Sequence, residues 1–312
     1  MHEPTRLVFG KEIIKLADKR DFVICNADTK NCGIENFGKL YPNREFSIGI
    51  AEQNLIATAA GLASCGHKVF VSTYAVFASL RACEQIRTYI CHTNFNVTIL
   101  GTHVGLQTGK DGASHIAIED ISIMRALPNM TIIEPSDNVA AVKAAHLAVD
   151  FNGPLYVRLH FAPSPIIHDP EKYEMILGKA NAIREYGDDV TFMVSGVLLS
   201  KVIEAADILK EQGIYATILE FHTLKPIDKN AIIKAAKKTK AIVTVEDHTI
   251  LGGLGSIVSE IVGENCPTII KRIGIQDQFG ESGDPELQYA KNKMTVKDMV
   301  DAAKYVIANK VG

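Results

Sequence analysis

The chain has 312 residues, of which 47% are hydrophobic and 22% are charged, so it can bury a large core and is expected to form about two domains. Its net charge of -3 comes from 33 basic and 36 acidic side chains without long runs of one sign, which argues against nucleic acid or an anionic membrane as a partner. No apolar run approaches the ~20 residues that span a bilayer, and the N-terminal segment has no apolar signal region. A cytoplasmic location is therefore expected.

The first half of the chain alternates helical and strand-like patterns. Helical spacing over residues 5–19 precedes a strand-like run over 22–25, and later strand-like runs cover 45–48, 69–72, 97–100, 131–133 and 155–159. Strands that alternate with helices form a parallel sheet with helices on both faces. We therefore predict a doubly wound α/β domain with a mostly parallel sheet over residues 1–161.

The pattern lapses over residues 162–189, where Pro163, Pro165 and Pro170 lie close together, and this segment is predicted to be a linker. A second alternating set follows, with strands over 190–194, 215–220, 242–245 and 268–273, helices over 200–211 and 255–262, and a closing helix capped by Thr295. Residues 190–312 are thus predicted to form a smaller, second doubly wound α/β domain.

Glu52 is expected at a strand-to-helix turn. The pattern predicts that the strand over 45–48 ends at Gly49 and that an apolar helix begins at Glu52. A carboxylate at a helix N-terminus often does no more than stabilise the helix dipole. The loops that follow parallel strands are, however, also the places where ligands bind. Both interpretations of Glu52 stay open on these residues alone.

Aromatic and histidine side chains follow the next strands. Tyr74 and Phe77 lie three residues apart, on one face of a helix, where aromatic rings form either core or the wall of a pocket. His103 follows the strand over 97–100, and His115 closes a glycine-rich loop that carries Asp111. Histidines titrate near neutral pH, so this group either binds a ligand in a cleft or bonds to backbone groups of the loops.

Three common motifs fail on inspection of their spacing. In the glycine run over 252–256, Val258 stands where the third glycine of a dinucleotide-binding motif belongs, so close backbone packing is expected there instead. Met193 occupies the first glycine of a nucleophile elbow around Ser195. The loop over 105–111 has the wrong spacing for a phosphate-binding loop. Hydrolase and nucleotide chemistry are therefore not supported.

Four blocks of sequence follow one another in a recognisable order: Gly-Ile-Ala-Glu-Gln (49–53), Ser-Thr-Tyr-x-x-Phe (72–77), Thr-His-x-Gly (102–105) and Asp-Gly-x-x-His (111–115). In these blocks the chain resembles the pyrimidine-binding domain of the transketolase family. The runs over 127–137 and 277–283 extend the resemblance to nearly the whole chain. The chain is similar to the separately encoded C-terminal subunit of a split, two-gene transketolase.

The resemblance implies a binding site for thiamine diphosphate. In the family, a glutamate at the position of Glu52 bonds a ring nitrogen of the aminopyrimidine and promotes removal of the thiazolium proton, which makes Glu52 both catalytic and cofactor-binding. The matching wall of the pyrimidine pocket is Tyr74 and Phe77, with Leu80 where a third aromatic residue is common. Asp28, at the carboxyl end of the strand over 22–25, is also assigned to cofactor binding.

The resemblance also implies substrate contacts. The histidines that match His103 and His115 hydrogen-bond hydroxyl or carbonyl oxygens of the sugar and take part in catalysis, and the aspartate that matches Asp111 recognises a hydroxyl that fixes stereochemistry. The reaction implied is transfer of a two-carbon ketol unit from a ketose to an aldose. Alternatives are a β subunit of a 2-oxo-acid dehydrogenase decarboxylase component and a non-catalytic scaffold subunit.

The far end of the substrate site departs from the family pattern. Transketolases for sugar phosphates hold the phosphate with two arginines, a serine and a histidine, and only Arg6 and His103 match here. Cys32 takes the place of the serine, and Phe161 takes the place of the second arginine. Loss of a guanidinium removes charge-assisted hydrogen bonds worth roughly 1.5 to 3 kcal/mol each.

A substrate with a smaller terminal charge is therefore the specific hypothesis, with 6-deoxy-6-sulfofructose as the donor. A sulfonate keeps tetrahedral oxygens but carries less charge than a phosphate, so Arg6 with His103 and His160 is expected to suffice. Arg158 lies three residues before Phe161 on the predicted strand and therefore points to the opposite face. An ordinary pentose-phosphate transketolase that acts on sugar phosphates is the alternative.

The metal motif of the family, Gly-Asp-Gly followed by Asn, is absent, since residues 187–189 read Gly-Asp-Asp. No metal ligand is therefore assigned to this chain. The Mg²⁺ or Ca²⁺ ion on the cofactor diphosphate needs carboxylate, amide and carbonyl oxygens, which a separate N-terminal transketolase subunit is expected to supply. Symmetric closure predicts an α2β2 assembly with that partner.

Overall fold

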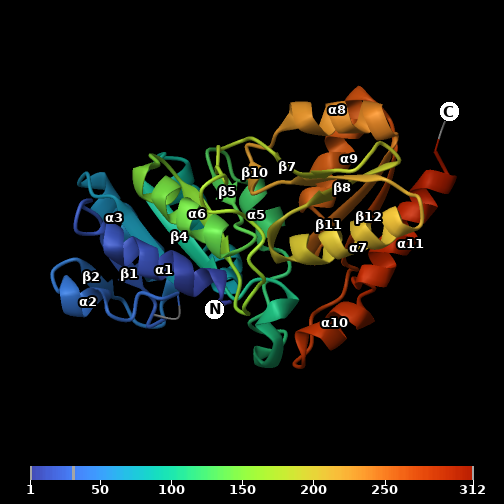
Figure 1. Cartoon of the computed structure of the whole chain (residues 1–312). Helices are drawn as coiled ribbons and strands as arrows, with labels where there is room; N and C mark the ends of the chain where they lie inside the picture. Colours follow the sequence, from blue (N-terminus) through green and yellow to red (C-terminus); the bar gives the residue numbers. More distant parts are fainter. Residues whose placement is uncertain (1, 30–31, 311–312) are drawn as a thin grey trace.

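The computed structural model of the chain describes residues 2–29 and 32–310 (Figure 1). Its first half builds a seven-stranded sheet in the order β10–β5–β6–β4–β3–β1–β2. All neighbouring strands are parallel except β10, which pairs with β5 in antiparallel orientation. The strands are β1 (Val23–Asn26), β2 (Glu45–Ser47), β3 (Val69–Tyr74), β4 (Val97–Thr102), β5 (Thr131–Ile133), β6 (Leu155–Leu159) and β10 (Thr223–Lys225).

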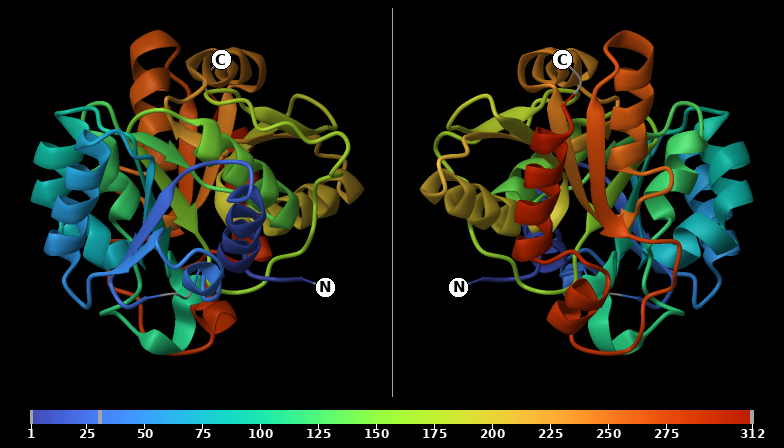
Figure 2. Two further views of the ribbon diagram at one scale, coloured as in Figure 1. Left: turned by 90° about the vertical axis from the view of Figure 1, so that its left-hand side faces the viewer. Right: turned by 90° about the vertical axis from the view of Figure 1, so that its right-hand side faces the viewer.

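Helices cover both faces of this sheet. On one face, α1 (Thr5–Leu16) packs against α6 (Asn138–Asp150), whose buried side is lined with alanines that allow close approach (Figure 2). The other face is covered by α3 (Glu52–Ser64), α5 (Asp120–Ala126), the short α4 (Cys83–Gln85) and two π-helices, η1 (Phe77–Arg81) and η2 (Ile86–Cys91). The short helix α2 (Phe37–Leu40) lies between β1 and β2 in sequence. The central strands β3, β4 and β6 are buried along almost their whole length, as expected for strands covered on both faces.

The second half forms a five-stranded sheet in the order β12–β11–β8–β9–β7, parallel except for β7. Helix α7 packs against α11 and α8 packs against α9, on opposite faces of the sheet (Figure 1). Thr295 caps α11 in a capping box with Asp298. The elements are β7 (Asn181–Glu185), β8 (Val190–Val194), η4 (Gly196–Leu198), α7 (Leu199–Glu211), β9 (Ala216–Glu220), α8 (Lys229–Thr239), β11 (Ala241–Thr249), α9 (Leu254–Asn265), β12 (Ile269–Ile275), α10 (Pro285–Lys291) and α11 (Val296–Ala308).

The predicted class, two doubly wound α/β domains with mostly parallel sheets, is confirmed. Two strands were absent from the sequence-based assignment. Strand β7 lies within the segment 162–189 that is predicted as a linker, and its edge position leaves most side chains partly or fully exposed, so it has no apolar signal. Strand β10 comes from the second half but joins the edge of the first sheet, which ties the two halves together. Within residues 2–29 and 32–310, no helix is long and apolar enough to cross a membrane.

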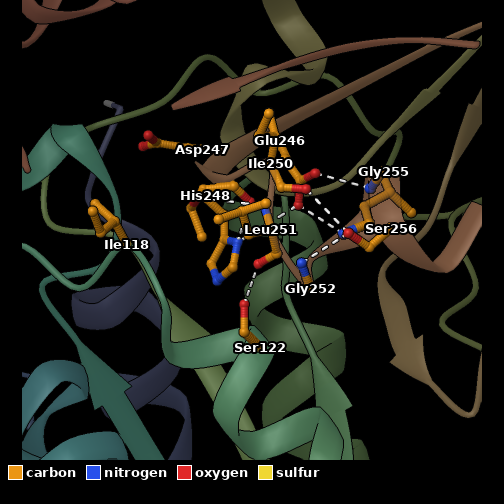
Figure 3. A network of polar contacts seen from close by, with 12 residues as sticks. Ile118, Ser122, Glu246, Asp247, His248, Ile250, Leu251, Gly252, Gly255 and Ser256 are labelled. Carbon is orange, nitrogen blue, oxygen red and sulfur yellow. Dashed lines mark hydrogen bonds and ion pairs between the residues drawn. The ribbon is translucent and has the colours of Figure 1, made fainter. Parts of the chain in front are cut away.

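Polar contacts lie at and near the junction of the two domains. The carboxylate of Glu246 accepts hydrogen bonds from the backbone N–H groups of Leu254 and Gly255, so it caps α9 from within the domain (Figure 3). Burial raises the pKa of Glu246 to about 8. A side chain at Gly253 would collide with this carboxylate, which confirms that the glycine run over 252–255 is a packing feature. The hydroxyl of Ser122, in the first domain, donates to the Leu251 carbonyl of the second.

A second buried group lies at the same junction. The guanidinium of Arg158 on β6 is fully buried and binds the carboxylates of Asp120 and Glu134. It also donates to the backbone carbonyl of Asp247 on β11, at 2.9 Å. As predicted, Arg158 lies away from Phe161, because it points into the junction. The ion pairs lie within the first domain, and the hydrogen bond to the Asp247 carbonyl links this buried group to the second domain.

Candidate active site

The carboxyl ends of β1, β2, β3 and β4 lie along one edge of the first sheet, because these strands are parallel. Glu52 begins α3 shortly after β2 ends, and Gly49 turns the chain between them with a φ of 76°. The Glu52 side chain is 2% exposed. Its Oε2 accepts a hydrogen bond of 2.7 Å from Nη1 of Arg81, whose side chain is 49% exposed. The sequence pattern gives no sign of this arginine.

The helix that carries Phe77, Leu80 and Arg81 is a π-helix. The Ala82 N–H reaches back five residues to the Phe77 carbonyl at 3.1 Å, which widens the turn. The Arg81 guanidinium lies over the Phe77 ring, 4.4 Å from its centroid. Leu80, on the same helix, is 51% exposed. Such π-helical turns often occur at functional sites, and here the turn brings Arg81 to both an aromatic ring and a buried carboxylate.

Aromatic and imidazole rings form a continuous row beside Glu52. We call this the aromatic row, and it consists of Phe77, Tyr74, His115, His103 and Phe161. Ring centroids lie 5.7 Å apart for Tyr74 and Phe77, and 4.2 Å apart for Tyr74 and His103. His115 contacts both Tyr74 and Phe77 at 5.4 Å. Residues that are distant in the sequence therefore meet, because each follows a strand of the same parallel sheet.

His103 is the most constrained member of the row. It follows β4 with a φ of 60°, in the left-handed region, and its side chain is 1% exposed. Nδ1 lies 3.0 Å from the Thr102 hydroxyl, and Nε2 lies 3.8 Å from Oδ2 of Asp111. Burial, with added repulsion from Arg6 and His115, lowers the pKa of His103 to about 3. The imidazole is therefore neutral at physiological pH.

The row ends at Phe161, just beyond β6. The Phe161 ring lies 4.6 Å from His103, and the guanidinium of Arg6 stacks over its other side at 4.5 Å. A cavity of about 530 Å³ opens beside Phe161 and Asp111, with Lys110 and Thr108 among its lining residues. Among the described residues, the buried hydroxyl of Thr108 has no hydrogen-bond partner. The charged residues that line the cavity are thus one cation, Lys110, and two carboxylates, Asp111 and Asp284.

Two residues predicted to bind substrate have polar partners inside the protein. The thiol of Cys32 is fully buried, lies 3.2 Å from the Ser72 hydroxyl, and has its pKa raised by burial to about 11. His160 is also fully buried, with Nε2 2.9 Å from Glu134 in the group around Arg158. Their predicted substrate contacts remain predictions, and the structure gives both side chains partners inside the protein.

Asp28 lies at the carboxyl end of β1, on the sheet edge that carries the other site residues. It follows β1, next to the end of β3, and it is exposed with a φ of 57°. Its N–H is held by Oδ1 of Asn26 at 3.1 Å. The backbone turn is therefore fixed, while the exposed side chain is available to a ligand. Its predicted role in cofactor binding stays a prediction.

The chemistry of the site fits the pyrimidine half of a thiamine cofactor. A buried carboxylate stands beside aromatic rings and an exposed Leu80, which suits an aromatic ring with a basic nitrogen. Within the described part of the chain, no group of three His, Cys, Asp or Glu side chains is arranged to hold a metal ion.

Comparison with known proteins agrees with the sequence blocks. Residues 4–161 match the family described as "Transketolase, pyrimidine binding domain", and residues 178–299 match "Transketolase, C-terminal domain". The chain is 38% identical over 300 residues to the 6-deoxy-6-sulfo-D-fructose transketolase subunit SqwH of Clostridium sp. (strain MSTE9), covering 96% of this chain and 92% of the relative. It is 37% identical over 275 residues to an apulose-4-phosphate transketolase subunit from Phocaeicola vulgatus, covering 88% of each.

A solved structure described as a split gene transketolase, inactive beta4 tetramer, is 38% identical to this chain. It superposes with a TM-score of 0.91 and covers 99% of both chains. The likeness therefore extends over both domains and over the way in which they are joined. The chain belongs to the transketolase family, and its two domains are that family's pyrimidine-binding and C-terminal domains.

Proposed function

We propose that the chain is one subunit of a thiamine diphosphate-dependent transketolase, which transfers a two-carbon ketol unit from a ketose to an aldose. The observation that carries the proposal is the buried Glu52 carboxylate at the start of the aromatic row. When bound, thiamine diphosphate supplies the nucleophilic carbon that takes up the ketol unit. The side chains of this protein bind and orient the reactants and move the protons.

Glu52 acts on a proton. Its carboxyl group would share a proton with a ring nitrogen of a bound pyrimidine, and the pyrimidine would then supply its exocyclic amine as a base. Arg81 holds the Glu52 carboxylate in place through the 2.7 Å ion pair. Tyr74 and Phe77 would hold the pyrimidine between aromatic surfaces, Leu80 would exclude water from its edge, and Asp28 would bind the cofactor from the end of β1.

His103, His115 and Asp111 bind the sugar. Because His103 is neutral, its Nε2 either donates to or accepts from a sugar oxygen without adding charge. His115 stands on the other side of Tyr74 and contacts the same substrate region. Asp111 lies within 3.8 Å of His103 and accepts a hydrogen bond from the hydroxyl whose configuration the enzyme selects. The three groups orient the carbon–carbon bond that breaks and re-forms.

A partner subunit completes the enzyme in this proposal. It supplies the diphosphate site with Mg²⁺ or Ca²⁺, and two copies of each chain form an α2β2 assembly. Two observations support a partner. The described residues of this chain hold no metal cluster, and the structural relative, a tetramer of β subunits, is described as inactive.

The far end of the substrate site favours a donor with a single negative charge, and 6-deoxy-6-sulfofructose is our specific proposal. Phe161 stands between Arg6 and His103, where a second arginine would help to bind a dianionic phosphate. Lys110 is the cation that lines the adjoining cavity. The Clostridium relative is named for a sulfonated ketose, which agrees with this choice.

A phosphorylated ketose is the second candidate for the donor. The Phocaeicola relative is named for apulose 4-phosphate at almost the same identity, so relatedness alone does not separate the two substrates. The structural difference lies at Phe161, and substitution there separates the candidates, as described in the Discussion.

Reconstitution tests the proposed reaction. The chain is mixed with its partner subunit, thiamine diphosphate and Mg²⁺, and the transfer of a ketol unit from ketose to aldose is followed by product analysis. We expect transfer that needs both subunits. Decarboxylation of a 2-oxo acid without ketol transfer would instead place the chain with the 2-oxo-acid dehydrogenase components. No reaction with any substrate pair, although cofactor binds, would favour a non-catalytic scaffold.

A further inference from the structure

The segment that carries Asp111 is held by residues of both domains. We call residues 105–112 the Asp111 loop, which contains the 3-10 turns of η3 (Leu106–Asp111). Within it, the backbone hydrogen bonds from Thr108 to Gly105 and from Gly112 to Gly109 are both 3.3 Å long. From the first domain, the Gly105 N–H donates to the Ala117 carbonyl at 2.9 Å, and the Gly112 carbonyl accepts from the N–H groups of His115 and Ile116 at 3.0 and 3.1 Å.

The beginning of the loop is tied to β11. The N–H of Leu106 donates to Oδ1 of Asp247 at 2.9 Å. The Asp247 side chain is 1% exposed, and its Oδ2 accepts a hydrogen bond of 2.8 Å from the Tyr289 hydroxyl on α10. Figure 3 shows Asp247 pointing away from Glu246, as expected for neighbours on a strand. Gly105 has room for no side chain, because a Cβ would lie 2.2 Å from Oδ2 of Asp247.

The end of the loop is tied to the segment before α10. The hydroxyl of Ser282 donates to the Lys110 carbonyl at 2.6 Å, and the N–H of Gly283 donates to the Gly109 carbonyl at 3.3 Å. Gly109 has a φ of 65° and a ψ of -109°, a conformation that glycine adopts more readily than other residues. Gly109 and Lys110, which accept these hydrogen bonds, immediately precede Asp111 in the chain. The C-terminal domain therefore hydrogen-bonds the loop both near its beginning, at Leu106, and near its end, at Gly109 and Lys110.

We propose that the C-terminal domain positions Asp111 for the substrate, with Asp247 and Ser282 as the positioning residues. The proposal rests on the proposed transketolase function. A loop released from Ser282 leaves the Asp111 carboxylate free to sample several places, so binding of the selected hydroxyl weakens while the proton transfer at Glu52 is unaffected. The domain thus contributes to substrate choice from outside the cofactor site.

The test is Ser282→Ala in the assembled two-subunit enzyme. Ser282 is exposed, so the variant is expected to fold. We expect KM for the acceptor to rise roughly threefold to tenfold, the ratio that one neutral hydrogen bond supports, with kcat changed less than about twofold. Discrimination between two acceptors that differ only in the configuration of the hydroxyl next to the carbonyl should fall by a similar factor. Hydrogen exchange of the amides of residues 105–112 should accelerate.

The matched control is Lys291→Ala, which breaks the exposed Lys291–Glu281 ion pair in the same segment without touching the loop. It should leave KM, discrimination and loop exchange at parental values. Asp247→Asn keeps an oxygen for the Leu106 N–H and should retain much of the parental discrimination, whereas Asp247→Ala should not. This rescue separates positioning from a general loss of stability.

Two results would overturn the inference. Unchanged loop exchange in Ser282→Ala would show that the hydroxyl does not hold the loop. Faster exchange with parental KM and discrimination would show that the tie is structural only. Failure of the proposed function is a separate outcome, because it would appear as absence of ketol transfer in the parent enzyme, and the exchange measurement tests the tie in either case.

Discussion

The two ends of the aromatic row carry the same pair of residue types in different arrangements. At one end Arg81 lies over Phe77 at 4.4 Å and also binds the buried Glu52. At the other end Arg6 lies over Phe161 at 4.5 Å, and the sequence comparison predicts that Phe161 replaces an arginine of the family pattern. The first end keeps the groups that the proposed chemistry needs. In our proposal, apolar surface replaces charge at the second end, and this replacement changes which substrates that end binds.

This comparison separates activation of the cofactor from recognition of the substrate. Substitutions at Glu52 should abolish turnover with every substrate, since all substrates use the same proton transfer. Substitutions at Phe161 should redistribute activity among substrates while leaving turnover with the best one largely intact. The predictions below test this division, in order of decreasing effect.

Glu52→Gln is expected to have the largest effect. An amide cannot share a proton with the pyrimidine nitrogen as a carboxyl group does, so kcat should fall by about 10² to 10⁴. The melting temperature should change little, because glutamine keeps the size of the side chain and an oxygen for Arg81. Exchange of the thiazolium C2 proton, followed by NMR, should slow in parallel. Exchange at the parental rate would reduce Glu52 to a structural carboxylate.

Phe161→Arg should change the substrate preference of the enzyme in favour of a phosphorylated ketose. A guanidinium at this place adds charge-assisted hydrogen bonds, so kcat/KM for fructose 6-phosphate relative to the sulfonated ketose should rise by about tenfold or more. Phe161→Leu is the matched control, because it removes the ring without adding charge. If arginine and leucine shifted the ratio equally, the loss of the ring rather than the gain of charge would be responsible.

The pH dependence of stability should show the burial of His103. Its pKa is lowered to about 3 in the folded protein, against an ordinary value of 6.5, so below pH 6.5 the unfolded chain binds a proton that the folded chain does not. This part of the stability is present above pH 6.5 and is lost as the pH falls. Between pH 6 and pH 5 the parent should lose about 1 kcal/mol more than His103→Gln. The free energy of unfolding is measured by urea denaturation at both pH values. An equal loss in the parent and in His103→Gln would contradict the assignment.

Arg81→Met should have the smallest effect of the four. The arginine side chain is 49% exposed, so solvent screens its ion pair with Glu52. We expect the affinity of the assembled enzyme for thiamine diphosphate, measured by calorimetry, to fall about twofold to fivefold. Arg81→Lys should lie between the parent and Arg81→Met. Tighter binding in the methionine variant would mean that Arg81 competes with the cofactor for Glu52.

The sequence predicts the fold well where a buried strand has a clear apolar pattern, and it predicts the site well where residues follow such strands. Strands β5, β6 and β8 have the predicted bounds, because each is a buried run that begins and ends sharply. Glu52, Tyr74 and His103 could be expected to meet, since each follows a strand of one parallel sheet. Their neighbourhood follows from topology and does not require knowledge of side-chain packing.

Other features depend on packing that no local pattern records. The contact of Arg81 with Glu52 requires a π-helical turn, and an apolar helix pattern does not distinguish that turn from an α-helix. Cys32 and His160 are predicted to bind substrate, yet their side chains are bonded to Ser72 and Glu134 inside the protein. The ties between the Asp111 loop and Ser282 join residues far apart in the sequence, so only the folded chain shows them.

The most direct test of the account is kcat/KM of the reconstituted two-subunit enzyme for three ketoses that differ only at the far end. These are 6-deoxy-6-sulfofructose, fructose 6-phosphate and fructose, each with the same aldose acceptor. The account predicts ketol transfer from all three that depends on Glu52, with the sulfonated ketose clearly preferred. A clear preference for fructose 6-phosphate would contradict the role given to Phe161, and absence of ketol transfer from every ketose would contradict the account as a whole.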